Sequence, residues 1–158
     1  PLQIAALTAR VANRGQGVRP HLFKSAPAGV KAGPADADAA GAAAAAEMPF
    51  KPAAFENVIA GMWRSVNDGG TGKGAFVEGL DVCGKTGSTQ VVSRESAERL
   101  SRAGREIKTH SWFSGFAPRD NPRIVVTVLV EYGGGGGATA APVARRIFEL
   151  FNRELQGK

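Results

Sequence analysis

The sequence has 158 residues, of which 43% are hydrophobic and 22% charged, a balance typical of one soluble domain with a buried core. Its longest apolar run, Ile124 to Val130, contains Thr127 and is far shorter than the ~20 residues needed to span a bilayer. The net charge of +6 comes from scattered Lys and Arg residues without interleaved aromatic residues, which argues against a nucleic-acid surface.

The ends and the cysteine content give two further expectations. The chain starts at Pro1 without a signal peptide and runs directly into a helical pattern, which predicts that it begins inside a longer protein. The single cysteine, Cys83, excludes an internal disulfide and offers no metal cluster. We therefore expect Cys83 to pack as a small hydrophobic residue, and we expect no metal or other cofactor.

Two helices are predicted in the first half of the chain. Apolar residues recur at helical spacing before Gly15, which predicts a helix over residues 2–13. A second helix is predicted from Pro52, which suits a first helical turn, to Asn67. Its buried stripe is formed by Phe55, Val58, Ile59, Met62 and Val66. Residues 26–47 are rich in alanine and lack a patterned apolar face, so they are predicted to be a flexible surface insertion.

Strand-forming segments dominate the second half. Four are predicted, at Phe76–Val77, Val82–Ser93, Trp112–Ala117 and Arg123–Tyr132. Three of them form a plausible antiparallel set, in which the turn "PRDNP" joins the last two. A mixed-charge loop over residues 94–108 lies between two of these strands.

A last helix, opened by Pro142, follows the loop Gly133–Gly137, which is predicted to be flexible. Its apolar residues Val143, Ile147, Leu150, Phe151 and Leu155 are predicted to lie on one face, and the helix is predicted to cover the sheet. The fold class is therefore α/β in the α+β sense, an antiparallel sheet covered by helices.

The segment "IVVTVLV", residues 124–130, is apolar at nearly every position. Such a strand is typically buried on both faces and has neighbours on both sides. As the last strand of this set it would be an exposed edge, which proteins avoid. The sequence thus predicts that part of the sheet lies outside this chain.

The segment "GLDVCGKT", Gly79 to Thr86, matches the phosphate-binding pattern G-x-x-x-x-G-K-[ST]. A phosphate loop needs a glycine-rich turn followed immediately by a helix. Here the following residues, "GSTQVV", favour a strand. A P-loop nucleotide-binding protein is kept as an alternative function.

The candidate site is the middle of the strand "VCGKTGSTQVV", where Lys85, Thr86, Gly87, Ser88 and Thr89 follow one another. A cation, several hydroxyls and a glycine that admits a second backbone suit a groove for an anionic, extended ligand. Lys85-Thr86-Gly87 also matches the K-T-G element of serine acyl-transferases that recognise penicillin.

Longer segments extend this match. In order, "VCGKTGSTQVV", "THSWFSGFAPRDNPRIVVTVLVEYGG" and "AAPVARRIFELF" resemble the end of the transpeptidase domain of class B penicillin-binding proteins. The segments "PLQIAALTARVANRG", "GVRPHL" and "FENVIAGMWRSVNDGGTG" resemble the preceding part of that domain. The loop "ESAERLSRAGR" and the ending "VLVEYGG" are most similar to the elongation-type penicillin-binding protein 2 subgroup.

This resemblance covers nearly the whole chain except the alanine-rich insertion and the charged loop. It implies that residues 1–158 are the C-terminal part of a transpeptidase domain with a penicillin-binding/serine β-lactamase-like fold. The rest of the sheet and the helical subdomain would then lie outside this chain.

The resemblance also implies a function, that of a peptidoglycan D,D-transpeptidase. A serine outside this chain would attack the carbonyl between two terminal D-alanines of a stem peptide, and β-lactams would acylate the same serine. Lys85 would supply positive potential and help relay protons, and Thr86 and Ser88 would bind the carboxylate. The Ser88 N–H would be one oxyanion donor, Gly87 would let the substrate backbone approach, and Thr89 completes the substrate-binding set.

The implied partners are the stem peptide and β-lactams, the remaining N-terminal part of the same protein, and the elongation machinery with its glycosyltransferase. The implied location is the periplasmic side of the cell inner membrane, with the anchor outside this chain.

Two family motifs depart from the pattern. No serine in this chain has a lysine three residues later, so the S-x-x-K nucleophile motif is missing and the chain alone is expected to be inactive. The S-x-N motif is matched literally by Ser65-Val66-Asn67, but just before K-T-G, and we interpret this match as accidental. A non-catalytic sensor or scaffold that kept the fold is therefore a further alternative.

Overall fold

The structure is a computed structural model. It describes residues 1–18, 20, 49–90, 96, 99, 102–104 and 109–156. The alanine-rich segment 26–47 and most of the charged segment 94–108 lie outside the described residues. Within the described part, no helix is both long and apolar enough to cross a membrane.

A three-stranded antiparallel sheet forms the centre of the molecule, as the sequence predicts. Its strands are β1 (Cys83–Thr89), β2 (His110–Ala117) and β3 (Ile124–Val130), in the spatial order β1-β2-β3. β2 is therefore the central strand, and β1 and β3 are the two edges among the described residues.

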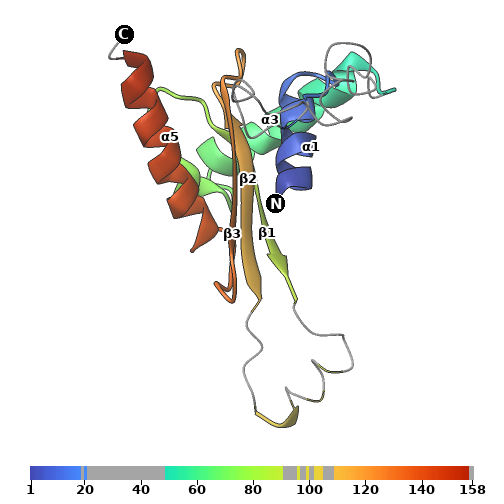
Figure 1. Cartoon of the computed structure of the whole chain (residues 1–158), viewed down its shortest axis with the longest axis vertical. Coiled ribbons are helices and arrows are strands. Elements are labelled where there is room, and N and C mark those ends of the chain that lie inside the picture. The colour runs from blue at the N-terminus through green and yellow to red at the C-terminus, as the bar shows by residue number, and fades with distance from the viewer. Residues whose placement is uncertain are drawn as a thin grey trace, which may run out of the picture.

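Helices cover both faces of this sheet (Figure 1). The helices α1 (Leu2–Ala12) and α3 (Pro52–Asn67) lie on one face, and α5 (Ala140–Gln156) lies on the other. A short 3₁₀ helix, η1 (Lys73–Ala75), packs beside α5. The predicted boundaries of α3 are confirmed at both ends, and Phe55, Ile59 and Val66 of its predicted stripe are buried. The predicted burial of Val58 is wrong, because this side chain is 49% exposed.

Each face has its own apolar core. On the face of α1 and α3, Ile59 of α3 packs with Cys83 of β1 and Phe116 of β2. On the face of α5, Phe148 packs with Phe113 of β2 in a larger cluster. All five side chains are fully buried. This double core holds β2 between two layers, while β1 packs through Cys83 on the side of α3.

A chain of hydroxyl groups ties α1 to the sheet. Thr8 Oγ1 and Ser114 Oγ lie 2.7 Å apart, and Ser114 Oγ lies 2.7 Å from Thr127 Oγ1. Thr8 and Ser114 are both buried. Because each buried hydroxyl finds a partner, the apolar layer under α1 tolerates three polar side chains.

The predicted strand at Phe76–Val77 is wrong. These residues follow η1 directly, without a strand partner, and the turn is closed by hydrogen bonds from Ala75 N to Gly72 O and from Phe76 N to Lys73 O. Val77 is buried in the core and Phe76 is exposed. The apolar character of Phe76–Val77 is explained by the packing of Val77 against α5 and the sheet, and not by a strand.

The predicted contact face of α5 is also wrong, although α5 does cover the sheet. Val143, Ile147 and Leu150 are 45%, 40% and 58% exposed. The residues of α5 that are buried are Ala140, Ala141, Ala144 and Phe148. The small alanine side chains allow a close approach of the helix to the sheet, and Phe148 fills the space between them. α5 thus carries a second apolar stripe that faces outward.

β3 is half-buried at most positions and pairs only with β2 among the described residues. The prediction that "IVVTVLV" forms an edge within this chain is therefore confirmed. An apolar strand with one open edge presents unpaired backbone groups that a further strand can use.

Candidate functional site

The five candidate residues all lie on β1, at the edge of the sheet opposite β3. Lys85, Ser88 and Thr89 are exposed, and Thr86 and Gly87 are half-buried. Because Lys85 lies within an extended strand, a phosphate loop, which needs a helix directly after its lysine, is excluded. The nucleotide-binding alternative is therefore not supported.

The Lys85 ammonium is available to a ligand. Its Nζ donates a hydrogen bond of 2.7 Å to the carbonyl oxygen of Thr86, and the side chain is exposed. No acidic side chain in the described ranges forms an ion pair with it. An unneutralised cation on a strand edge provides a binding point for a carboxylate.

Thr71 belongs to the site, although the sequence analysis did not include it. Its Oγ1 lies 2.8 Å from Thr86 Oγ1, within hydrogen-bond distance. Thr71 lies in the turn after α3, which folds back so that Gly72 N donates to Ser65 O over 2.9 Å. In the sequence, Thr71 is one hydroxyl residue in the glycine-rich segment "DGGTGKG", which follows the helix predicted to end at Asn67. Nothing in this segment predicts that Thr71 contacts Thr86.

An open hollow of about 560 Å³ lies beside Lys85. Its wall is mainly apolar and is formed by α3, through Val58, Gly61, Met62 and the polar Ser65, and Thr71 and Lys85 also line it. A concave apolar wall with a few polar groups at one end is typical of ligand sites. The arrangement suits a ligand with an anionic end and an apolar body.

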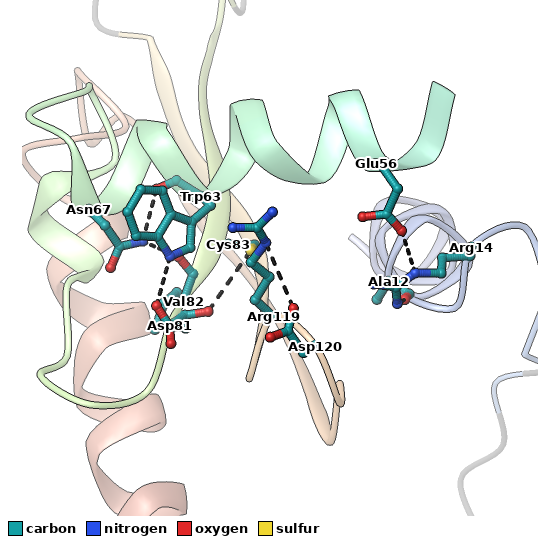
Figure 2. Close-up of polar contacts among 10 residues, drawn as sticks. All are labelled: Ala12, Arg14, Glu56, Trp63, Asn67, Asp81, Val82, Cys83, Arg119 and Asp120. Carbon is teal, nitrogen blue, oxygen red and sulfur yellow. Dashed lines mark hydrogen bonds and ion pairs between the residues drawn. The ribbon is translucent and has the colours of Figure 1, made fainter. Parts of the chain in front are cut away.

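The literal S-x-N match has a structural role (Figure 2). The Asn67 Nδ2 donates hydrogen bonds of 2.8 Å to the carbonyl oxygens of Trp63 and Val82. Trp63 Nε1 donates to Asp81 Oδ1 over 2.8 Å. The bonds to Val82 and Asp81 join the end of α3 to the residues just before β1, so Asn67 is engaged in placing the strand and does not point at the hollow.

Cys83 is the one cysteine, and it lies at the start of β1 in the core. Burial raises the pKa of its thiol to about 12, which the nearby Arg119 guanidinium opposes only in part. A thiol that stays neutral is a poor nucleophile. The expectation that Cys83 packs as a small hydrophobic residue is confirmed.

Taken together, β1 offers a cation, three hydroxyls and an open backbone edge. These groups can bind a carboxylate and align an extended peptide, which is the role of β-strand addition in peptide recognition. They do not include an activated nucleophile: Ser88 is exposed, and no hydrogen bond joins it to a base within the described residues.

Comparison with known proteins identifies the family. The profile of the penicillin binding protein transpeptidase domain matches residues 1–149. The peptidoglycan D,D-transpeptidase MrdA of Haemophilus influenzae is 37% identical over 96% of this chain. This chain spans only 23% of that relative's length.

Two solved structures have the same fold. Pseudomonas aeruginosa PBP2 in complex with WCK 5153 matches 96% of this chain with 30% identity and a TM-score of 0.66. Penicillin-binding protein A from M. tuberculosis, solved as a ceftriaxone acyl-enzyme complex, matches 92% with 27% identity and a TM-score of 0.66. This chain covers 30% of each of those chains. The chain therefore belongs to the penicillin-binding protein transpeptidase domain family, of which it contains part of one domain.

Proposed function

We propose that this chain is the carboxylate-binding part of a peptidoglycan D,D-transpeptidase. The observation that carries the proposal is the position of Lys85-Thr86-Gly87-Ser88 on an edge strand, beside a hollow, with the Lys85 ammonium unpaired by any described acidic group. Membership of the family and the name of the Haemophilus relative support the same reaction.

In the proposed reaction, a serine from a part of the protein outside this chain attacks the carbonyl between two D-alanines. Its Oγ–C bond forms, the C–N bond breaks, and D-alanine leaves with the proton that the serine gave up. The amine of a second stem peptide then attacks the acyl-enzyme and releases the serine. Each step passes through a tetrahedral oxyanion, which needs hydrogen-bond donors at a fixed place.

The residues of β1 assist this reaction by binding the substrate, and Lys85 also helps to relay protons. Lys85 contributes positive potential, and the hydroxyls of Thr86 and Ser88 donate to the substrate carboxylate. The Ser88 backbone N–H is one oxyanion donor. Gly87 allows the substrate backbone to align with the strand, and Thr89 extends the polar row.

We infer the setting of the whole protein from the same reaction. Its substrate is the stem peptide, its inhibitors are β-lactams, and it acts on the periplasmic side of the inner membrane, where the polymer is cross-linked. The rest of the same protein completes the site, and the elongation machinery with a glycosyltransferase supplies new strands. The acyl-enzyme formed by the M. tuberculosis neighbour with ceftriaxone supports the assignment of β-lactams as inhibitors.

The test uses the whole protein and the rate of labelling by a fluorescent penicillin. Lys85→Ala and Thr86→Val each remove a group that binds the carboxylate or orients the acyl group, so we expect the acylation rate to fall about 100- to 1000-fold, the range known for loss of an oxyanion-hole donor. Lys51→Ala is the matched control, because Lys51 is an exposed lysine at the far end of α3. Labelling of both variants near the wild-type rate refutes the assignment, and a wild-type protein that is never labelled favours the scaffold alternative.

A further inference from the structure

The loop between β3 and α5 is closely bound to the sheet. Gly134 N donates to Thr109 O over 2.9 Å, and Ser111 Oγ donates to Gly135 O over 3.2 Å. Both partners lie at the start of β2 or just before it. The glycine loop, which the sequence predicts to be flexible, thus has a defined path beside the central strand.

Two glycines of this loop touch the candidate site. A Cβ on Gly136 would lie 2.4 Å from Trp112 O, 2.6 Å from Gly87 O and 3.0 Å from Gly87 N. A Cβ on Gly137 would lie 2.4 Å from Thr71 O. Neither glycine has a left-handed φ, so the close approach of backbone to backbone, and not the backbone conformation, excludes a side chain here.

The two glycines contact two neighbours of the Thr86 hydroxyl, namely Gly87 and Thr71. Gly136 lies against Gly87, which separates Thr86 from Ser88 along β1. Gly137 lies against Thr71, whose hydroxyl is 2.8 Å from that of Thr86. Two adjacent glycines therefore support the strand and the turn that together orient Thr86.

We propose that Gly136 and Gly137 are positioning residues, which hold the Gly87 backbone and the Thr71 turn so that the Thr86 hydroxyl and the Ser88 N–H meet the substrate correctly. This inference rests on the proposed function, because it assigns a role relative to the same carboxylate and acyl group. It adds a structural element, the loop before α5, which acts through Gly87 and Thr71.

The expected size of the effect follows from the contact distances. Real Cβ atoms essentially never lie within 3.0 Å of such a neighbour, so at 2.4 Å a methyl group forces a shift of about 0.6 Å in the loop or in the strands. A site must be held within about 0.5 Å of its productive geometry, and a displacement of about 1 Å can cost 100-fold in rate. We therefore expect Gly136→Ala to lose about 10- to 100-fold in acylation.

The experiment compares two β-lactams in the whole protein, a penicillin with its free carboxylate and the methyl ester of that penicillin. The acid-to-ester ratio of the acylation rate constants reports carboxylate recognition and does not depend on the amount of folded protein. We expect Gly136→Ala to lower this ratio several-fold, whereas a purely structural loss lowers both rates equally. The control is Gly135→Ala, because a Cβ on Gly135 meets nothing within 4 Å and its φ is not left-handed.

The outcomes separate this inference from the proposed function. A wild-type protein without penicillin acylation, or without preference for the acid, overturns the proposed function and this inference with it. If Lys85→Ala abolishes the preference for the acid over the ester but Gly136→Ala keeps it at the wild-type level, only this inference is overturned. If Gly136→Ala does not yield folded protein, Gly137→Ala and Thr71→Val decide, and an unchanged acid-to-ester ratio in both overturns the proposal.

Discussion

The role of Asn67 can be tested by removing its side chain. Asn67→Ala deletes two hydrogen bonds of 2.8 Å, one to the Trp63 carbonyl within α3 and one to the Val82 carbonyl just before β1. Each such bond contributes about 1 kcal/mol net, and the site is half-buried, so we expect a loss of about 2 kcal/mol in the free energy of unfolding. This loss corresponds to a factor of about 30 in the folding equilibrium.

The assay is urea unfolding of the whole protein, measured together with penicillin labelling in buffer without urea. With a urea dependence of about 2 kcal/mol per M, the unfolding midpoint of the transpeptidase domain falls by about 1 M. Acylation per folded molecule stays within about threefold of wild type, because Asn67 contacts backbone carbonyls and not the hollow.

Ser65→Ala tests the other polar residue of the same literal motif, a residue that lines the hollow. The Ser65 Oγ is buried and has no hydrogen-bond partner among the described residues. Removing a buried, unpaired hydroxyl is expected to be neutral or slightly stabilising. A fall in acylation of about 100-fold in Asn67→Ala, with unfolding unchanged, would show that Asn67 acts in the chemistry and would refute the structural assignment.

Two further predictions concern β1. Gly87→Ala places its methyl 3.4 Å from Trp112 Cβ, an ordinary contact, so we expect a free energy of unfolding within about 1 kcal/mol of wild type. We expect acylation to be at least about 10-fold slower, because in the proposed function the substrate backbone lies against Gly87, and unchanged labelling contradicts this close approach. Burial raises the pKa of the Cys83 thiol from 9.0 to about 12, so the thiol stays protonated in the folded protein at a pH where it ionises in the unfolded chain. The free energy of unfolding therefore falls as the pH rises from about 9 toward 12. Urea unfolding at pH 8 and pH 10 should show a smaller pH effect in Cys83→Ala than in wild type, and an equal effect contradicts the prediction.

Much of the fold could be predicted because its signals are local. Pro52 and a single apolar stripe define α3, and the turn "PRDNP" defines the β2–β3 hairpin. α5 was harder because it has two apolar stripes. Hydrophobicity favours the face with Val143, but the sheet contacts the face with Ala144, since small side chains permit the closer approach.

The candidate site could be predicted only in part, for a related reason. Lys85 and its neighbours form one continuous segment, and the pattern of the segment itself predicts a strand. Thr71 and Gly136 reach the same place from other parts of the chain, through a hydrogen bond and a backbone contact. Small residues in a turn or loop carry no periodic signal, so such contacts become visible only in three dimensions.

The two edge strands of the sheet, β1 and β3, differ in the kind of chain that can pair with them. Along β1 the side chains are cationic and hydroxylic, so an incoming chain can keep much of its hydration and leave again, which suits turnover. Along β3 they are aliphatic, and a chain that docks there expels water and is retained. We therefore expect the β1 edge to suit transient association and the β3 edge to suit a strand that stays bound.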